Sequence, residues 1–535
     1  MVDVVSKLEK LIDVGISLSA ETSSHLLLEK ILESARSITN ADGGTIYSVT
    51  ENFVKIEILK NESLNLSYGG SATKNTFFPE IPLWKADKTP NLHNVVTYCV
   101  HKNTTVNIEN SYQSDLFDFS GTRSFDGKMG YRSESFLTVP LRNHENTIIG
   151  VLQLINARDP QTKQIAPFDQ INQRLVEALA SQAAIAITKE QLMQGLKDLF
   201  ESMIKIIADA IDRRSPYTGG HCRRVPAITM MLAEAAHYDN QGIFKDFHLN
   251  AKDFYELEVA SWLHDCGKIV TPEHVIDKAT KLQTIFDRIE LVETRFEIVK
   301  RDLKIQMLES QIKQLSESGQ NIQPNQIAQK KFEQEIEKLD AEFVFLKKSN
   351  KGGEYMRPED QERIKNLGQI KWVFNNQEMS LLSADEIYNL CISRGTLNNE
   401  ERRIINNHID VTIDMLMSLP FPKHLKNVPE FAGGHHERMD GKGYPKGLTR
   451  DQLSIQARIM GIADVFEALT AKDRPYKPGK KLSEALEIMD QMAQSGHLDP
   501  DIYNLFLKNN IHLKYAEKFL DAAQNDLLSK NQKTA

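Results

Sequence analysis

The chain has 535 residues, more than one compact hydrophobic core accommodates, so we expect two or three domains. Its 65 Lys and Arg residues stand against 73 Asp and Glu residues, a formal net charge of -8 at pH 7. This mild acidity argues against a protein that coats nucleic acid, and a small anionic ligand would have to be met by locally placed cations and metal ions.

The cysteines and the N-terminal segment indicate a cellular compartment. The chain has four cysteines without CxxC spacing, which predicts neither a disulfide framework nor a zinc ribbon: Cys99, Cys222, Cys266 and Cys391. Residues 1–7 lack the features of a signal peptide, and no stretch is apolar over the length that spans a bilayer. The sequence therefore predicts a cytoplasmic protein without a membrane partner.

The first 190 residues alternate between helical and strand patterns. Apolar spacing predicts an amphipathic helix over residues 23–39, and strand-like runs follow at 44–49 and 53–59. Two more such runs, 135–141 and 147–155, are separated by polar residues that suit a hairpin turn. This α+β pattern, with the text around Tyr131–Leu141 and Ile149–Ala157, resembles the closing half of a GAF domain, so we predict a GAF-like sensory domain over residues 1–190.

A possible coiled coil follows the GAF-like region. Apolar residues recur at alternating intervals of four and three over residues 191–212: Leu192, Leu196, Leu199, Met203, Ile206 and Ala210. This spacing places one apolar seam along a helix, which either packs on its own domain or joins two chains in a parallel coiled coil. We favour the second interpretation and predict a connecting helix and a homodimer.

Strand patterns nearly vanish from Ser202 onward, so the second half is predicted to be all-helical. Apolar residues at intervals of four and three recur over 285–303 and again over 332–346, with Gly319 and Pro324 between the two runs. We interpret residues 284–394 as an inserted helical hairpin arm within a domain of residues 196–530. No cluster of metal-ligand residue types lies in this arm.

Two pairs of neighbouring residues carry the chemistry of the second half. His264 and Asp265 are adjacent, and His435-His436 are followed by a run ending in Gly443-Tyr444-Pro445. Together these match the two signatures of the HD-GYP phosphodiesterases, metal-dependent hydrolases of cyclic dinucleotides such as cyclic di-GMP. The resemblance implies a multidomain fold, in which an all-α HD-type metallohydrolase domain with an inserted helical hairpin follows the GAF-like domain.

The resemblance also implies a set of seven metal ligands, in the family's order: His221, His264, Asp265, His408, His435, His436 and Asp464. Asp265 would bridge two divalent ions, so that charge on a phosphoryl group is neutralised from both sides. Histidine and carboxylate ligands without thiolate favour iron or manganese over zinc or nickel. The acidic residue that holds a third ion in some members is replaced by Tyr217, so we expect two ions.

Substrate contacts and activity are likewise assigned by resemblance. Asp265 and Lys268 are the expected catalytic residues, and Lys268, one turn past Asp265, is expected to meet a phosphate oxygen. Two groups of residues are expected to line the substrate site with Lys268: Gly443 with Tyr444, and Arg474 with Lys477. Glu467 replaces the Asp of the usual text, without expected loss of activity.

The predicted function is hydrolysis of cyclic di-GMP to pGpG under control of the GAF domain, and GMP stays open as an alternative end product. GGDEF-type proteins are expected among its signalling partners. A non-catalytic receptor or scaffold, and a hydrolase of another cyclic dinucleotide or nucleotide, stay open as alternatives.

Overall fold

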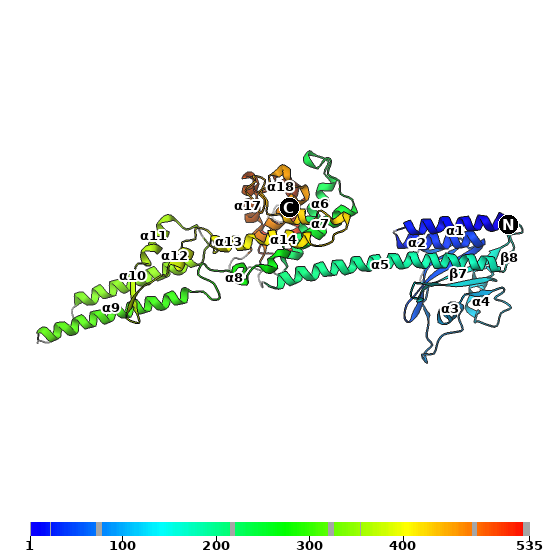
Figure 1. The fold of residues 1–535 in the computed structure, drawn as a ribbon, viewed down its shortest axis with the longest axis horizontal. Coiled ribbons are helices and arrows are strands. Elements are labelled where there is room, and N and C mark those ends of the chain that lie inside the picture. The colour runs from blue at the N-terminus through cyan, green and yellow to red at the C-terminus, as the bar shows by residue number, and fades with distance from the viewer. Residues whose placement is uncertain are drawn as a thin grey trace. The chain divides into compact units, whose positions relative to one another are not determined.

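The computed structural model describes residues 2–21, 23–70, 78–214, 220–318, 326–353, 355–472 and 479–527. The chain forms two compact units, Met1–Phe200 and Glu201–Ala535. Helix α5 (Gln170–Arg214) belongs to the first unit at its start and to the second at its end (Figure 1). Within the described ranges, none of the helices combines the length and the apolar character that crossing a membrane requires.

The first unit is an antiparallel sheet with helices on both faces. Its strands are β1 (Ala41–Val49), β2 (Phe53–Asn61), β3 (Leu66–Gly69), β4 (Ile81–Pro82), β5 (Val106–Ile108), β6 (Phe136–Arg142), β7 (Ile148–Arg158) and β8 (Ile165–Ala166). The main strand order is β3-β2-β1-β7-β6-β5, with β4 paired to β2 and β8 to β7. Besides α5, its helices are α1 (Val2–Ala20), α2 (Ser24–Thr39), α3 (Val95–Lys102) and α4 (Ser120–Met129).

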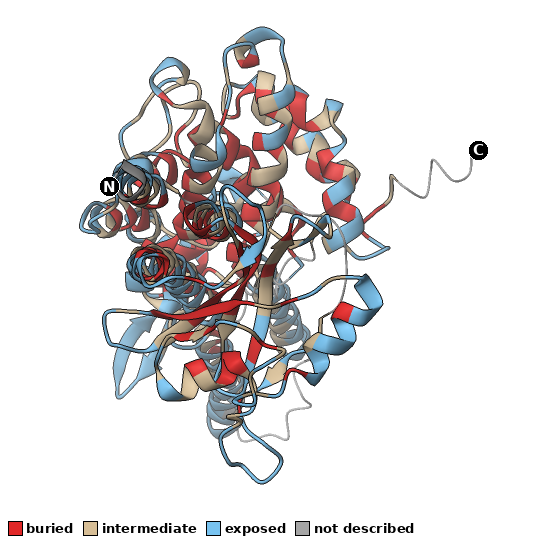
Figure 2. Cartoon of the chain, turned by 90° about the vertical axis from the view of Figure 1, so that its right-hand side faces the viewer, coloured by how far each residue is buried: buried red, intermediate tan, exposed pale blue. Residues whose placement is uncertain are grey.

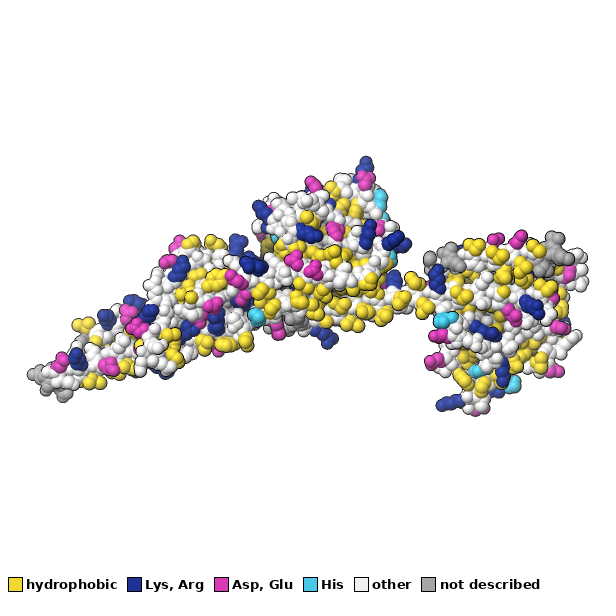
Figure 3. All heavy atoms as spheres, in the orientation of Figure 1, with side chains coloured by type: hydrophobic (Ala, Val, Ile, Leu, Met, Phe, Trp, Pro, Cys, Tyr) yellow, Lys and Arg dark blue, Asp and Glu magenta, His cyan; other side chains and the backbone are white. Residues whose placement is uncertain are grey.

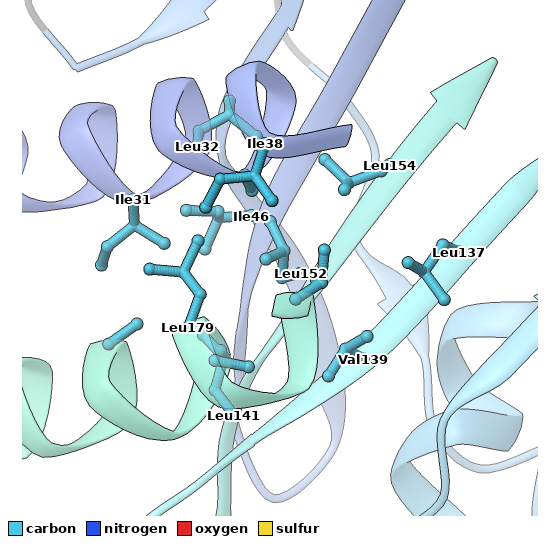
Figure 4. Packing of buried hydrophobic residues seen from close by; sticks show 14 of the residues in the cluster. Ile31, Leu32, Ile38, Ile46, Leu137, Val139, Leu141, Leu152, Leu154 and Leu179 are labelled. Atoms are coloured by element: carbon cyan, nitrogen blue, oxygen red, sulfur yellow. The ribbon is translucent and has the colours of Figure 1, made fainter. Parts of the chain in front are cut away.

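Helices α1, α2 and α5 cover one face of this sheet, and α3 and α4 lie on the other (Figure 1). Ile31 and Leu32 of α2 and Leu179 of α5 point toward strand residues such as Ile46 and Leu152 (Figure 4). The strands are buried along much of their length (Figure 2). The predicted α+β architecture is confirmed, because the central strand-like runs lie buried in the sheet and the helices pack their apolar sides against it.

The second unit is built mainly of helices. They are α6 (His221–Tyr238), α7 (Ala251–Leu263), α8 (Glu273–Ile276), α9 (Ile289–Ser318), α10 (Gln326–Asn350), α11 (Pro358–Leu367), α12 (Ala384–Leu390), α13 (Asn399–Asn406), α14 (His408–Met417), α15 (Val428–Gly433), α16 (Ile455–Thr470), α17 (Leu482–Gln494), α18 (Pro500–Lys508) and α19 (Ile511–Phe519). Four short 3-10 turns lie between them at Gly242–Phe244, Cys266–Val270, Lys423–Leu425 and Arg450–Gln452.

The predicted insertion holds more than a helical hairpin. Helices α9 and α10 do lie side by side, with the rings of Phe296 and Phe343 5.5 Å apart (Figure 1). The region also contains α11, α12 and a two-stranded hairpin of β9 (Lys371–Phe374) and β10 (Gln377–Ser380). An all-helical second half was therefore wrong at these strands. Their side chains are mostly exposed and show no alternation, and the remaining signal is the turn Asn375-Asn376, where both residues have positive φ.

The expected connecting helix is the C-terminal part of α5, which is one continuous helix of 45 residues. Five apolar residues of the predicted seam are each more than half exposed: Leu192, Leu196, Leu199, Met203 and Ile206. Figure 3 shows hydrophobic side chains at the surface along this helix. In the chain by itself, these side chains do not pack on their own domain.

Candidate metal centre

Seven separated residues converge in the second unit. His221 is the first residue of α6, His264 follows the last residue of α7, and Asp265 precedes the turn Cys266–Val270. The other four are His408 at the start of α14, His435 and His436 directly after α15, and Asp464 within α16. All except His436 are buried. Most of the seven residues lie at or just beyond the end of a helix.

One group is formed by His221, His264 and Asp265, whose ligand atoms lie within 4.8 Å of one another. Nε2 of His221 lies 3.2 Å from Oδ2 of Asp265 and 3.3 Å from Nε2 of His264. Asp464 completes this side of the cluster, with its Oδ1 3.3 Å from Nε2 of His221 and 4.0 Å from Nε2 of His264.

A second group is formed by His408, His435 and His436, again with ligand atoms within 4.8 Å of one another. Nε2 of His408 lies 3.2 Å from Oδ1 of Asp265. Asp265 therefore directs one carboxylate oxygen to each group, so its position between them is that of a bridging ligand.

Backbone carbonyls fix the tautomers of three histidines. Nδ1 of His264 donates to the carbonyl of Ser261 at 2.7 Å, and Nδ1 of His408 and of His435 donate to the carbonyls three residues earlier. Each of these rings therefore turns an unprotonated Nε2 toward the cluster. Within the described residues, Nε2 of His408, Nε2 of His435 and Oδ1 of Asp265 are buried without a hydrogen-bond partner.

Acceptor atoms that face one another in a buried site fit a cation between them. A lone pair on Nε2 of His408 directed at a carboxylate oxygen of Asp265 is repulsive unless a proton or a metal ion lies between the two atoms. Burying several unsatisfied acceptors would cost about 1–3 kcal/mol each. The donor set of imidazoles and carboxylates therefore fits divalent metal ions.

Electrostatics in the metal-free chain support this interpretation. Burial lowers the pKa of His436 to about 4 and, together with the neighbouring His436 and His264, lowers the pKa of His435 well below its usual value. These imidazoles are neutral at pH 7, the form that binds metal. Burial opposes the charge on Asp265, but Lys268 and His264 hold the pKa of that carboxyl well below its usual range.

His221 lies in the most negative part of the site. Burial opposes its protonation, yet Glu467, Asp265 and Asp464 together raise its pKa well above the usual value. Glu467 is buried, accepts a hydrogen bond from Nδ1 of His221, and is paired with Nε of Arg224 at 2.7 Å. No role for Glu467 was predicted, and the one signal for it was its position three residues after Asp464, on the same face of α16.

Gly267 allows the second group to approach Asp265. A Cβ added to Gly267 would lie 2.0 Å from the carbonyl oxygen of His408 and 2.6 Å from the amide nitrogen of Thr412. The amide of Gly267 donates to Oγ1 of Thr412 at 2.9 Å, which joins the Cys266–Val270 turn to α14. Only a residue without Cβ permits this approach of the backbones, and with it the position of His408.

The predicted substrate residues are placed in part. Nζ of Lys268 lies 2.6 Å from Oδ2 of Asp265, and the ring of Tyr444 stacks on His436 with centroids 4.8 Å apart. A Cβ on Gly443 would lie 2.4 Å from backbone atoms of Glu437 and Arg438, so the turn requires glycine.

Glu437 was not predicted to take part, although it is buried and its carboxylate accepts hydrogen bonds from the amides of Lys446 and Leu448. It thereby holds the loop that carries Tyr444. Arg474, Lys477 and Tyr217 lie outside the described residues.

Two family models match the chain. A GAF domain model matches residues 23–187 and an HD domain model matches residues 378–502. The predictions of a GAF domain and an HD domain are therefore confirmed. The HD match includes His408, His435, His436 and Asp464, and it begins within the segment that we interpreted as an insertion.

Three curated relatives illustrate the similarity. A 3'3'-cGAMP-specific phosphodiesterase 1 of Vibrio cholerae is 38% identical over 116 residues, which cover 22% of this chain and 26% of the relative. Cyclic di-GMP phosphodiesterases of Pseudomonas aeruginosa and Thermotoga maritima are 46% and 36% identical, over 14% and 22% of this chain and 17% and 32% of their own lengths. The chain thus spans less than a third of each of these relatives.

Two solved structures are similar to part of the chain. The GAF domain of an Acinetobacter phosphoenolpyruvate-protein phosphotransferase is 18% identical, covers 36% of this chain and 98% of its own, and has a TM-score of 0.26. A GAF domain/HD domain protein from Geobacter sulfurreducens is 20% identical, covers 33% of this chain and 98% of its own, and has a TM-score of 0.24.

Proposed function

We propose that this chain, which carries a GAF domain and an HD domain, is a metal-dependent phosphodiesterase that hydrolyses cyclic di-GMP under control of its GAF domain. The observation that carries the proposal is the placement of Asp265 between two groups of buried imidazoles, with one oxygen toward each. Relatives named as cyclic di-GMP and 3'3'-cGAMP phosphodiesterases support this choice of substrate class.

Two divalent ions fit the donor atoms. His221, His264 and Asp464 would hold one, His408, His435 and His436 the other, and Asp265 would bridge them. Bound ions would supply positive charge to a phosphoryl group and lower the pKa of a water molecule. We favour iron or manganese, since the donors are imidazole and carboxylate without thiolate, and two ions rather than three.

The remaining side chains orient the phosphodiester. Lys268 carries a half-buried cation beside Asp265, and Asp265 and Asp464 raise the pKa of its ammonium against the effect of burial. It therefore stays charged at pH 7 and can donate to a non-bridging phosphate oxygen. Tyr444, held against His436, offers an aromatic edge to the substrate. We assign the same phosphate-binding role to Arg474 and Lys477 by resemblance.

The intact donor set favours hydrolysis over a purely receptor function, because a receptor has no need of seven converging ligands. Cyclic di-GMP is the proposed substrate, with pGpG and then GMP as products. The mixed dinucleotide 3'3'-cGAMP is the second candidate, since relatives named for each of the two substrates are similar to this chain.

We propose that the active form is a homodimer. The exposed apolar residues of α5 repeat with the a/d spacing of a two-stranded coiled coil. A parallel pair of these helices would join two GAF domains to two HD domains and transmit a signal between them. The four cysteines are free, three of them buried, which suits the reducing cytoplasm that we propose as the location.

The decisive experiment is anaerobic purification, metal analysis and chromatographic identification of the products from cyclic di-GMP and, separately, from 3'3'-cGAMP. We expect two metal ions per chain and conversion of cyclic di-GMP to pGpG. Asp265→Ala should lose bound metal and turnover together, because the bridging carboxylate is removed. A metal-loaded wild-type chain that binds either dinucleotide without cleaving it would favour the receptor alternative.

A further inference from the structure

A cavity of about 630 Å³ lies at the base of the α9–α10 arm, apart from the residues of the metal centre. Among the described residues, its lining combines five cationic side chains with one carboxylate and two aromatic rings: Lys281, Lys348, Lys351, Arg357, Arg363, Asp360, Phe345 and Tyr355. In a chain with net charge -8, this is a local concentration of positive charge. Its volume is within the usual range for small-molecule sites.

The most informative member of the lining is Lys281, which is 1% exposed. Its Nζ donates to the carbonyl oxygens of Leu390 at 2.9 Å and Ile392 at 2.7 Å, and its other neighbour is the sulfur of Met356 at 3.8 Å. Among the described residues, no carboxylate pairs with this ammonium. Burial lowers the pKa of Lys281 to about 8, as expected for a charge that carbonyl dipoles alone stabilise.

Three of the other cations, Arg357, Arg363 and Lys351, have only partly exposed carboxylate partners or none among the described residues. Arg357 is paired with Asp360 at 3.0 Å, but its side chain is 68% exposed, so this pair contributes little. Arg363 is paired with Glu342 at 2.8 Å and its guanidinium lies over the ring of Phe345. Lys351 makes no ion pair within the described part of the chain. An entering anion could therefore take up these cations at small cost.

The exposed aromatic ring in the lining indicates which class of anion the cavity fits. Tyr355 is 60% exposed although it lines the cavity, so its ring is accessible for stacking. Gly352 has φ +67, and a Cβ there would lie 2.6 Å from the carbonyl oxygen of Gly395, so this glycine lets the loop after α10 close on the end of the insertion. Cations for phosphate beside an aromatic surface for a base form a combination that matches a nucleotide.

We propose that this cavity is a second, non-catalytic site that binds a nucleotide, with its phosphate near Lys281 and Lys351 and its base on Tyr355. Residues next to Lys281 in the chain contact the helix that precedes a metal-ligand histidine. Lys278, three residues before Lys281, is buried and paired with Glu401 at 2.7 Å, and Glu401 caps α13, the helix that directly precedes His408. An occupied cavity therefore adjoins the segment that positions one metal-ligand histidine.

Photolabelling of the metal-loaded full-length chain with 8-azido-GMP tests the site, with the labelled peptides identified by mass spectrometry. We expect label on the segment 345–363, separate from any label near Tyr444. Lys351→Glu should lower labelling of that segment on the order of tenfold, since it places a negative charge against the phosphate. Lys338→Glu is the matched control, because Lys338 is an exposed residue of α10 outside the cavity, and it should leave labelling unchanged.

Two further measurements test the contribution of Lys281 and the identity of the ligand separately. Lys281→Met removes the buried charge but keeps the apolar stem, and it should also lower labelling of the segment. Unlabelled GMP should protect the segment at concentrations at which inorganic phosphate does not. Labelling that is absent from the segment, or that is equal in Lys351→Glu and wild type, would overturn the site. Equal protection by inorganic phosphate would overturn its assignment to a nucleotide. Hydrolysis and metal content, measured on the same samples, report on the metal centre independently.

Discussion

Glu467 accepts a hydrogen bond from Nδ1 of His221, although the two residues are 246 positions apart in the chain. The contact orients the imidazole so that Nε2 of His221 is directed at Asp265 and Asp464. Arg224, from the same helix as His221, pairs with the other oxygen of Glu467. Burial disfavours the charge on Glu467, but His221 and Arg224 lower its pKa to about 2, so the carboxylate is ionised at neutral pH.

We therefore expect Glu467→Gln to weaken metal binding by about tenfold to a hundredfold, because a neutral amide orients the imidazole less firmly and no longer raises its basicity. Competition with a graded series of chelators, read by metal analysis, measures the change. Glu467→Asp, the residue of the usual family text, should retain more affinity than Glu467→Gln. The exposed Glu484→Gln is the control. Unchanged metal affinity in Glu467→Gln would show that His221 needs no such partner.

Lys268→Ala should keep both metal ions and impair the handling of the substrate. The ammonium of Lys268 pairs with Asp265 but contributes no metal-ligand atom, and it is placed to donate to phosphate. Loss of one such charge-assisted contact is expected to lower kcat/KM for cyclic di-GMP by about a hundredfold. Steady-state kinetics with parallel metal analysis tests this expectation. If the Lys268→Ala variant lost its metal ions, the role of Lys268 would be to stabilise the metal site rather than to bind the substrate.

Replacing residues 286–392 with a short flexible linker should leave the metal centre assembled, because all seven proposed ligands lie outside the segment. The ends of the segment lie close together, since Lys281 donates to the carbonyl oxygens of Leu390 and Ile392. Short connections between close ends carry a small entropic cost. Metal content and basal hydrolysis should survive, and oligomeric state or response to the GAF domain should change.

A shorter deletion, of residues 289–380, is the matched comparison, because it keeps the two carbonyls that Lys281 uses. Folding of the shorter deletion with failure of the longer one would assign residues 381–392 to the HD core. That outcome would agree with an HD match that begins at residue 378. A metal-free or insoluble product from both deletions would show that the arm itself belongs to the catalytic core.

Asp499 gives a pH dependence that is independent of metal. It is buried between Arg450 at 2.9 Å and Arg458 at 2.6 Å, and against the effect of burial these arginines lower its pKa. A carboxyl with a lowered folded-state pKa contributes stability above its unfolded value of about 3.9 and loses it as pH falls through the folded value. Asp499→Asn should therefore be destabilised relative to wild type at pH 7, and the difference should shrink as pH falls below about 4.

Urea unfolding at a series of pH values, followed by circular dichroism, measures this effect. Asparagine retains an oxygen that can accept the amides of Asp501 and Ile502 at the start of α18, so the substitution isolates the charge. Asp501→Asn is the control, because Asp501 is half exposed and also contacts Arg450. A destabilisation of Asp499→Asn that is the same at every pH would assign the effect to packing rather than ionisation.

The sequence by itself indicated one helix and four strands of the first unit, and it supplied the candidate residues of the proposed metal centre. The strand-like runs at residues 135–141 and 147–155 became paired strands because their composition and the turn between them are local properties. The vicinal pair His264-Asp265 and the pair His435-His436 were recognisable for the same reason, since each motif lies within a few residues. The hairpin β9–β10 was not predicted, because its strands are short and exposed and therefore show no alternation of apolar and polar residues.

Only the tertiary structure decided how these local pieces meet. The carboxylate of Asp265 faces two histidine groups because Gly267 lets α14 pack within reach, and Glu467 meets His221 because α16 packs on α6. The cavity beside Lys281 likewise joins that residue to a loop some seventy positions later. Periodicity and turn chemistry act over a few residues, whereas the partner of a buried charge is set by which helices pack together. A buried charge without a partner destabilises the folded state, so the packing of the helices decides which pairs form.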